Sequence, residues 1–251
     1  EYAKIMLPEL TFPYLIPGQE VLLDDGKIHL KIVEKAENVT ENGGENTQEK
    51  RYFAKVLWGG LLKSRKSAAL PGAKIYPPTL TNSDLANIKI AKEMGVTGVM
   101  QPFVRDHSDL ECVKEALREA GAEDIRLFAK IENMDGVRKL EELLPAADEI
   151  VIARGDLGNA VHLWDLPGVQ RQIAEKCRAA GKPFMVVTQM LASMERSPVP
   201  TRAEVNDIFH AVMDGAASIM VTGETAVGDY PVEVIRYMVN TVRSAEKKEN
   251  R

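Results

Sequence analysis

The stretch FAKIEN, residues 128–133, has the pattern of a buried β-strand that ends in charged side chains. Side chains alternate across a strand, so Lys130 and Glu132 point to the same side of it. A buried charge without a partner is costly, so something must compensate this pair. Either the two charges form an internal salt bridge, or they face a polar ligand at the end of the strand.

FAKIEN lies in a series of alternating strands and helices that begins at Thr79. We expect strands at residues 96–103, 125–132, 149–155, 183–190 and 218–224. We expect helices at residues 83–94, 108–120, 135–144, 169–180, 202–214 and 231–247. Two helix starts have capping-box spacing, Ser108 with Glu111 and Thr201 with Glu204, and a glycine ends four helices, at positions 95, 121, 181 and 215. Such alternation requires a parallel sheet, either doubly wound or closed as a (β/α)8 barrel.

Polar groups follow every strand of this series, and they favour the barrel. They are Arg105, Lys130 with Glu132, Arg154 with Asp156, Thr188 with Gln189, and Thr222 with Glu224. A (β/α)8 barrel builds its active site at this rim from several strands, whereas a doubly wound sheet concentrates it at one switch point. The predicted fold class is therefore α/β, of the (β/α)8 TIM-barrel type, with only about five β/α units present.

The first part of the chain has a different pattern. Residues 15–37, LIPGQEVLLDDGKIHLKIVEKAE, alternate polar and apolar side chains on both sides of Asp25-Gly26, which predicts a β-hairpin. A polar loop is expected around Asn42-Gly43-Gly44, and a third strand in RYFAKVLWGG, residues 51–60. We therefore predict a small all-β domain over residues 1–76 and the later part of a barrel over residues 77–251.

Composition excludes several classes of function. The chain has 251 residues, of which 45% are hydrophobic and 27% charged, with a net charge of -5 and scattered basic residues, so neither nucleic acid nor a membrane is an expected partner. No run approaches the ~18 apolar residues of a membrane span, and no signal pattern opens the chain. We expect a cytoplasmic protein with small-molecule partners, whose Cys112 and Cys177 are packing thiols.

The chemistry of the rim residues predicts a metal site. Glu132 and Asp156 are hard oxygen ligands on neighbouring strands, and two carboxylates that leave positions to water or substrate are typical of Mg²⁺ beside a phosphate or carboxylate. Lys130 would then stabilise an oxyanion or enolate. The turn RGDLG, residues 154–158, offers backbone N–H groups that could hold a substrate carboxylate. The structural alternative is a salt bridge from Lys130 to Glu132 or Asp156.

Several segments resemble, in order, the signature segments of the pyruvate kinase family. They are AKIEN (129–133), ARGDLG (153–158), TQMLASM (188–194), PTRAEVND (200–207) and TGETAVGDYP (222–231). The earlier VLLDDGKI (21–28), ENGG (41–44) and LPG (70–72) are similar to that family's lid domain. The resemblance implies transfer of a phosphoryl group from phosphoenolpyruvate to ADP, giving pyruvate and ATP in glycolysis, with Mg²⁺ or Mn²⁺ as cofactor.

The resemblance also implies a role for each matching residue. Lys130 would stabilise the enolate and assist phosphoryl transfer, and Thr188 would contact the substrate near the carbon that is protonated. Glu132 and Asp156 would bind the divalent cation. The remaining expected contacts are those of Gly155 and Asp156, whose N–H groups would bind the substrate carboxylate, and of Lys66, which would lie near the transferred phosphate and the nucleotide.

Five strands cannot close a barrel, and family members have three further strands before the lid. Those strands include the segment that supplies K⁺ ligands, so K⁺ dependence is expected although its ligands are not in this chain. The chain is part of a longer polypeptide, is completed by another chain, or is a divergent remnant; a homo-oligomer is compatible with each. Two alternatives stay open: a non-catalytic homologue that only binds metal and substrate, and a Mg²⁺-dependent aldolase of the phosphoenolpyruvate/pyruvate type, which would need no nucleotide lid or Lys66.

Overall fold

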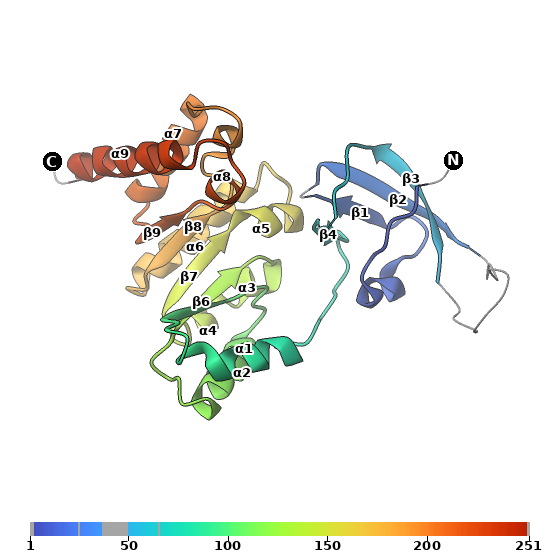
Figure 1. Cartoon of the computed structure of the whole chain (residues 1–251), viewed down its shortest axis with the longest axis horizontal. Coiled ribbons are helices and arrows are strands. Elements are labelled where there is room, and N and C mark those ends of the chain that lie inside the picture. The colour runs from blue at the N-terminus through green and yellow to red at the C-terminus, as the bar shows by residue number, and fades with distance from the viewer. Residues whose placement is uncertain (1–2, 25, 37–49, 65, 250–251) are drawn as a thin grey trace. The chain divides into compact units, whose positions relative to one another are not determined.

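The computed structural model describes residues 3–24, 26–36, 50–64 and 66–249. The chain forms two compact units, Glu1–Pro78 and Thr79–Arg251 (Figure 1). Each unit has its own buried core. Among the helices built from described residues, none combines the length and the apolar character needed to cross a bilayer.

The first unit is an antiparallel sheet with the strand order β3-β2-β1-β4. Its elements are η1 (Glu9–Tyr14), β1 (Glu20–Leu23), β2 (Ile28–Lys35), β3 (Tyr52–Trp58) and β4 (Ala68–Ala69). Leu23 pairs with Ile28 across the turn, so the predicted hairpin is confirmed, and Gly26 supplies the left-handed residue with a φ of 81°. The third predicted strand is confirmed as β3, whereas the loop predicted around Asn42-Gly43-Gly44 lies outside the described residues.

The second unit is built on a parallel sheet whose strands follow one another in chain order. They are β5 (Gly98–Gln101), β6 (Arg126–Ile131), β7 (Glu149–Ala153), β8 (Phe184–Val187) and β9 (Ser218–Met220). Every neighbouring pair is parallel. A doubly wound sheet reverses its strand order at a switch point, whereas a (β/α)8 barrel adds strands in sequence. The predicted fold class, with five β/α units of the barrel type, is confirmed.

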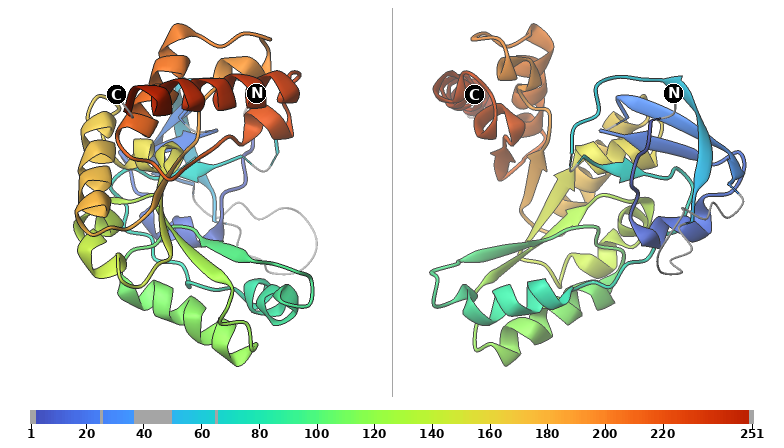
Figure 2. Two further views of the ribbon diagram at one scale, coloured as in Figure 1. Left: turned by 90° about the vertical axis from the view of Figure 1, so that its left-hand side faces the viewer. Right: turned by 45° about the vertical axis from the view of Figure 1, so that its right-hand side comes forward.

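Helices connect these strands and follow the outer side of the curved sheet (Figure 2). They are α1 (Asn82–Ala91), α2 (His107–Glu119), α3 (Met134–Arg138), α4 (Leu140–Leu143), α5 (Arg154–Ala160), α6 (Leu166–Ala179), η2 (Ala192–Glu195), α7 (Arg202–Met213), α8 (Gly223–Ala226) and α9 (Pro231–Glu249). The helix predicted over residues 135–144 is broken into α3 and α4 at Lys139, which has a φ of -96° and a ψ of 14°. The short helices α5 and α8 were not predicted.

The two faces of the parallel sheet have different neighbours. On β6, Leu127, Ala129 and Ile131 belong to the large core that includes the helices. The intervening Phe128 packs instead with a small cluster around Val151 and Val187. Because side chains alternate, Lys130 lies on the same face as Phe128. The strand therefore buries one face against helices and presents Lys130 on the other.

The helix ends predicted from local sequence signals are confirmed in part. The capping box at Thr201 is confirmed, because the Glu204 N–H donates to Thr201 Oγ1 over 3.2 Å and the Thr201 N–H donates to Glu204 Oε2 over 2.8 Å. The box predicted at Ser108 is wrong. Asp106, two residues before Ser108, is the N-cap of α2 instead. Its carboxylate accepts the Ser108 N–H over 3.1 Å. The four helix-ending glycines have φ values of 73°, 62°, 63° and 88° and are confirmed.

Candidate active site

The charged pair of FAKIEN forms a salt bridge at the carboxyl end of β6. Lys130 Nζ lies 2.8 Å from Glu132 Oε1, with the lysine side chain 24% exposed and the glutamate side chain 2% exposed. The other carboxylate oxygen, Glu132 Oε2, accepts the N–H of Phe103 over 2.7 Å. Both oxygens of a buried carboxylate thus have a partner, which offsets the cost of its burial.

The last residue of FAKIEN holds the neighbouring loop in place. Asn133 caps α3 by accepting the Gly136 N–H over 2.9 Å, and its Nδ2 donates to the Val104 carbonyl over 3.1 Å. A Cβ on Gly136 would lie 2.6 Å from that same carbonyl oxygen, so only glycine permits this approach. Glu132 and Asn133 therefore both fix the loop that follows β5.

A second set of contacts joins the ends of β7 and β8. The Gly155 N–H donates to Thr188 Oγ1 over 3.0 Å, and the Thr188 hydroxyl donates to the Val187 carbonyl. The Arg154 guanidinium donates to the Thr188 carbonyl, over 2.7 Å from Nη2 and 3.3 Å from Nε. Thr188 is thereby held through both its side chain and its backbone.

Backbone strain collects around these residues. Four non-glycine residues in the described parts of the chain have a positive φ: Asp24 (51°), Phe103 (52°), Thr188 (75°) and Gln189 (54°). For a β-branched threonine this conformation is an outlier, and such strain costs about 1–3 kcal/mol per residue. Phe103 binds Glu132 and Thr188 binds Gly155. Strain of this kind persists where the surroundings over-determine the backbone, which is frequent at functional sites.

Asp156 lies in the first turn of α5 and is half-buried. The segment RGDLG was predicted as a turn, but it forms the start of this short helix. One of the two N–H groups predicted for a substrate carboxylate, that of Gly155, is directed at Thr188 Oγ1. A substrate at this position would therefore share that donor with Thr188 or displace it.

Two further rim residues have structural contacts. The Arg105 guanidinium lies 2.5 Å from Asp109, whose side chain is 4% exposed. Burial opposes ionisation of Asp109, but hydrogen bonds from Arg105 and Thr79 outweigh it and lower the pKa of the carboxyl to about 2. Glu224 is buried and accepts the N–H groups of Leu191 and Thr222, over 3.2 Å and 2.8 Å. It thereby joins the loops that follow β8 and β9.

Lys66 belongs to the first unit, where it pairs with a strained aspartate. Its Nζ lies 2.8 Å from Asp24 Oδ1, and Lys27 lies 3.7 Å from Oδ2 of the same carboxylate. The hydrogen bond from Lys66 lowers the pKa of Asp24 below its usual value. The Asp24 N–H also donates to the Ser67 carbonyl over 3.0 Å. A backbone hydrogen bond therefore adds to the ion pair in holding the segment that carries Lys66.

Glu132 and Asp156 are oxygen donors of the kind that a hard divalent cation takes. Glu132 and Asp156 follow the paired strands β6 and β7, and each carboxylate oxygen has two lone pairs. The salt bridge to Lys130 and the Phe103 N–H thus leave acceptor capacity on both oxygens of Glu132. Within the described residues no group of three or more His, Cys, Asp or Glu side chains is placed to hold a metal ion. A site with two protein carboxylates leaves the other positions to water and substrate, as Mg²⁺ prefers.

The fold and the rim define an α/β protein of the TIM-barrel type whose polar residues gather at the carboxyl ends of its strands. Within that class the chain belongs to the pyruvate kinase family, because the family model described as the barrel domain of pyruvate kinase matches residues 5–235. The family resemblance found in the sequence is thereby confirmed.

Curated relatives support the same assignment. The chain is 38% identical to a pyruvate kinase of Bacillus licheniformis over 233 residues, which are 93% of this chain and 38% of that protein. It is 40% identical to a pyruvate kinase of Geobacillus stearothermophilus, over 91% of this chain and 38% of that protein. It is 36% identical to a pyruvate kinase of Candida albicans, over 93% of this chain and 44% of that protein. The chain thus spans about two fifths of the length of these relatives.

Two residues of the site escaped the sequence-based prediction. Asn133 is the last residue of FAKIEN, and its position just before a predicted helix is the signal for its capping role, because asparagine is a preferred N-cap. Asp207, which binds Arg154 over 2.7 Å, lies 53 residues further along the chain. No local spacing signals a contact of that range.

Proposed function

We propose that the chain carries the metal- and substrate-binding residues for phosphoryl transfer from phosphoenolpyruvate to ADP, with Mg²⁺ or Mn²⁺ as cofactor and pyruvate and ATP as products. The observation that carries this proposal is the Lys130–Glu132 pair at the end of β6, next to the strand that leads to Asp156. A lysine and two carboxylates at neighbouring strand ends suit a reaction that depends on positioning and charge stabilisation.

Glu132 and Asp156 would hold the divalent cation, which supplies charge neutralisation for the phosphate and enolate oxygens. Lys130 would add a compact positive charge that stabilises the developing enolate. In the salt bridge with Glu132 this charge is already fixed at the rim, 2.8 Å from Oε1. The residues therefore hold opposite charges in place before any substrate arrives, which is the arrangement that electrostatic catalysis requires.

Thr188 and Lys66 would have separate roles. The Thr188 hydroxyl, held by the Gly155 N–H at 3.0 Å, would contact the substrate near the carbon that is protonated. Gly155 and Asp156 would offer backbone N–H groups to the substrate carboxylate. Lys66 would exchange its contact with Asp24 for a phosphate oxygen of the nucleotide. K⁺ dependence, a cytoplasmic location and homo-oligomer formation are part of the same proposal.

The test is pyruvate formation from phosphoenolpyruvate by the chain with Mg²⁺ and K⁺, measured with and without ADP. We expect turnover that depends on ADP and falls by about 100-fold or more in Lys130→Met, which removes a main electrostatic stabiliser. Lys139→Met is the matched control, because Lys139 pairs with Asp106 on the surface, 3.2 Å away.

Other outcomes would select the alternatives. Pyruvate chemistry that ignores ADP would favour an aldolase. Binding of Mg²⁺ with oxalate, an enolate mimic, in the absence of any turnover would favour a non-catalytic member of the family. Absence of both binding and turnover would contradict the proposed function of this chain.

A further inference from the structure

The side chain of Arg154, which follows the preceding strand β7, holds Thr188 in its unusual backbone conformation. Thr188 and Gln189 both have a positive φ, of 75° and 54°. The carbonyl between them accepts two hydrogen bonds from Arg154, over 2.7 Å from Nη2 and 3.3 Å from Nε. Because this carbonyl belongs to the peptide that joins the two strained residues, its direction sets the rotation of that peptide.

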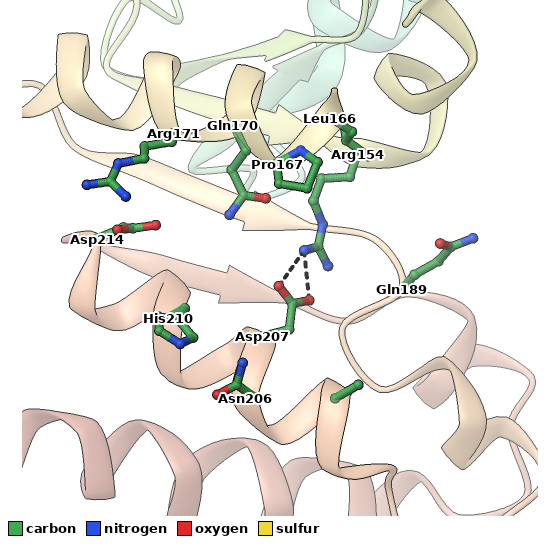
Figure 3. A pocket seen from close by; sticks show the side chains of 11 residues that line it. Arg154, Leu166, Pro167, Gln170, Arg171, Gln189, Asn206, Asp207, His210 and Asp214 are labelled. Atoms are coloured by element: carbon green, nitrogen blue, oxygen red, sulfur yellow. Dashed lines mark hydrogen bonds and ion pairs between the residues drawn. The ribbon is translucent and has the colours of Figure 1, made fainter. Parts of the chain in front are cut away.

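Arg154 is in turn fixed by an aspartate of α7 (Figure 3). Its Nη1 donates to both oxygens of Asp207, over 2.8 Å and 2.7 Å, and the arginine side chain is only 12% exposed. Nη2, which bonds the Thr188 carbonyl, also lies 2.8 Å from the sulfur of Met190. A planar guanidinium with partners on Nη1, Nη2 and Nε has one orientation in this environment.

The same strand end holds the Thr188 side chain. The Gly155 N–H, one residue after Arg154, donates to Thr188 Oγ1 over 3.0 Å. A Cβ on Gly155 would lie 3.4 Å from Thr188 Cγ2, an ordinary van der Waals contact, so the two residues lie directly against each other. If the Thr188 carbonyl lost its anchor, the positive φ of Thr188 could relax. Rotation about the Thr188 N–Cα bond would then carry Cβ and the hydroxyl away from the Gly155 N–H.

The Arg154–Asp207 pair lies in the wall of a pocket of about 500 Å³ lined mainly by α6 and α7. Lining residues from these helices include Gln170, Asn206 and His210. The guanidinium thus has one side toward this pocket and another toward the Thr188 carbonyl. Asp207 connects α7 to the strand-end rim through this one arginine.

We infer that Arg154 is a positioning residue for the Thr188 hydroxyl, oriented by Asp207, and that it acts on the substrate only through Thr188. This inference rests on the proposed function, in which Thr188 contacts the substrate. Arg154 holds the Thr188 carbonyl and so keeps the positive φ that places the Thr188 side chain. Asp207 sets the rotamer of Arg154.

The experiment uses the chain, Arg154→Met, Arg154→Lys, Asp207→Asn and the double variant Arg154→Met/Asp207→Asn. Two quantities are measured: the affinity for oxalate in the presence of Mn²⁺, and the hydrogen-exchange rate of the Gly155 amide by NMR. Arg126→Met is the matched control, because Arg126 pairs with the buried Glu149, 3.2 Å away, at the other end of the strands. Affinity for Mn²⁺ alone and thermal unfolding are recorded for every variant.

We expect Arg154→Met to lose about 10-fold or more in oxalate affinity, because a small displacement of a contacting group has effects of this size. The Gly155 amide should exchange faster by a similar factor, while Mn²⁺ affinity stays within about 2-fold, because Arg154 is not a metal ligand in the proposal. Arg154→Lys should recover part of the loss, since a lysine can keep one bond to the Thr188 carbonyl. The double variant should be no worse than Arg154→Met, as expected for residues that act in series.

Distinct results would overturn this inference and the proposed function. If the parent chain binds no oxalate with Mn²⁺, the proposed function fails. If the parent binds oxalate and Arg154→Met binds it equally well, or if Arg126→Met loses as much, Arg154 has no positioning role. Should Arg154→Met fail to fold, Asp207→Asn decides the question, because unchanged oxalate affinity and unchanged Gly155 exchange in that variant would contradict the inference.

Discussion

Lys130 Nζ lies 2.8 Å from Glu132 Oε1, at the point where β6 ends and the proposed metal site begins. The ammonium therefore occupies one face of a carboxylate that is also the proposed metal ligand. A cation that binds Glu132 at Oε1 shares this oxygen with Lys130 or displaces the ammonium, and a cation at Oε2 still lies close to the ammonium. Charge repulsion between the ammonium and the metal would then weaken metal binding. Both cations would nevertheless attract the same anionic substrate.

We predict that Lys130→Met binds Mn²⁺ more tightly than the parent by about 3-fold or more, because it removes a competing positive charge at short range. Without metal the variant should be destabilised by roughly 3–5 kcal/mol, the usual cost of leaving a buried charge without its partner. Mn²⁺ titrations followed by electron paramagnetic resonance, together with urea unfolding, measure both effects. Mn²⁺ binding that is unchanged or weaker in the folded variant would contradict competition between Lys130 and the metal at Glu132.

Gly136→Ala should destabilise the second unit by about 1–3 kcal/mol, the range for overpacking. Its Cβ would lie 2.6 Å from the Val104 carbonyl oxygen, and a backbone atom cannot rotate away. Gly168→Ala is the matched control in α6, because its Cβ would meet nothing within 4 Å. That control should gain up to about 1 kcal/mol from helix propensity. Equal unfolding free energies of the two variants in urea would be the contrary result.

Acid should destabilise the protein through Asp109. Its folded-state pKa of about 2 lies below the unfolded value of 3.8, so its contribution is present above the unfolded pKa and is lost as pH falls through the folded one. The shift corresponds to about 2 kcal/mol. Asp109→Asn should remove that part of the pH dependence in urea unfolding between about pH 5 and about pH 2. Asp124→Asn, which alters an exposed pair with Lys92, should leave the profile close to that of the parent.

Asp106→Ala should cost about 1 kcal/mol of stability because it removes the cap of α2. Ser108→Ala should cost less, since the Ser108 side chain only donates to the Asp106 carboxylate over 2.6 Å. Thr201→Ala at the confirmed capping box of α7 gives the reference value. Thermal unfolding of the three variants ranks their losses of stability. A larger loss for Ser108→Ala than for Asp106→Ala would restore the original capping prediction.

The sequence predicted the order and type of the main elements because each strand is a short apolar run bounded by glycine or charge. It placed the end of the fourth strand of this series too late. Residues 183–190 were predicted, but β8 ends at Val187, because Thr188 and Gln189 adopt a positive φ. Threonine favours strands by propensity, so only tertiary contacts, here with Arg154 and Gly155, account for the break.

The candidate site was predictable only in its local part. Lys130 and Glu132 are two residues apart, and strand alternation alone puts them on one face. From the sequence Arg154 could be placed only at the rim, because its partner Asp207 lies on α7, beyond the next strand β8. Arg105 was expected at the rim, and the structure places it against Asp109, one turn into α2. Contacts between elements that are distant in sequence leave no periodic signal.

In the proposed function, Glu132, Asp156 and Lys130 form one site for a divalent cation and an enolate-like anion. This arrangement is tested most directly by the affinity for oxalate in the presence of Mn²⁺, because oxalate binding reports on these three residues without requiring turnover. We predict that the chain binds oxalate only when Mn²⁺ is present. Glu132→Gln and Asp156→Asn should each weaken Mn²⁺ binding about 10-fold or more. Lys130→Met should weaken oxalate binding while Mn²⁺ still binds. Oxalate binding that is independent of Mn²⁺, or Mn²⁺ binding unaffected by both carboxylate variants, would contradict the account.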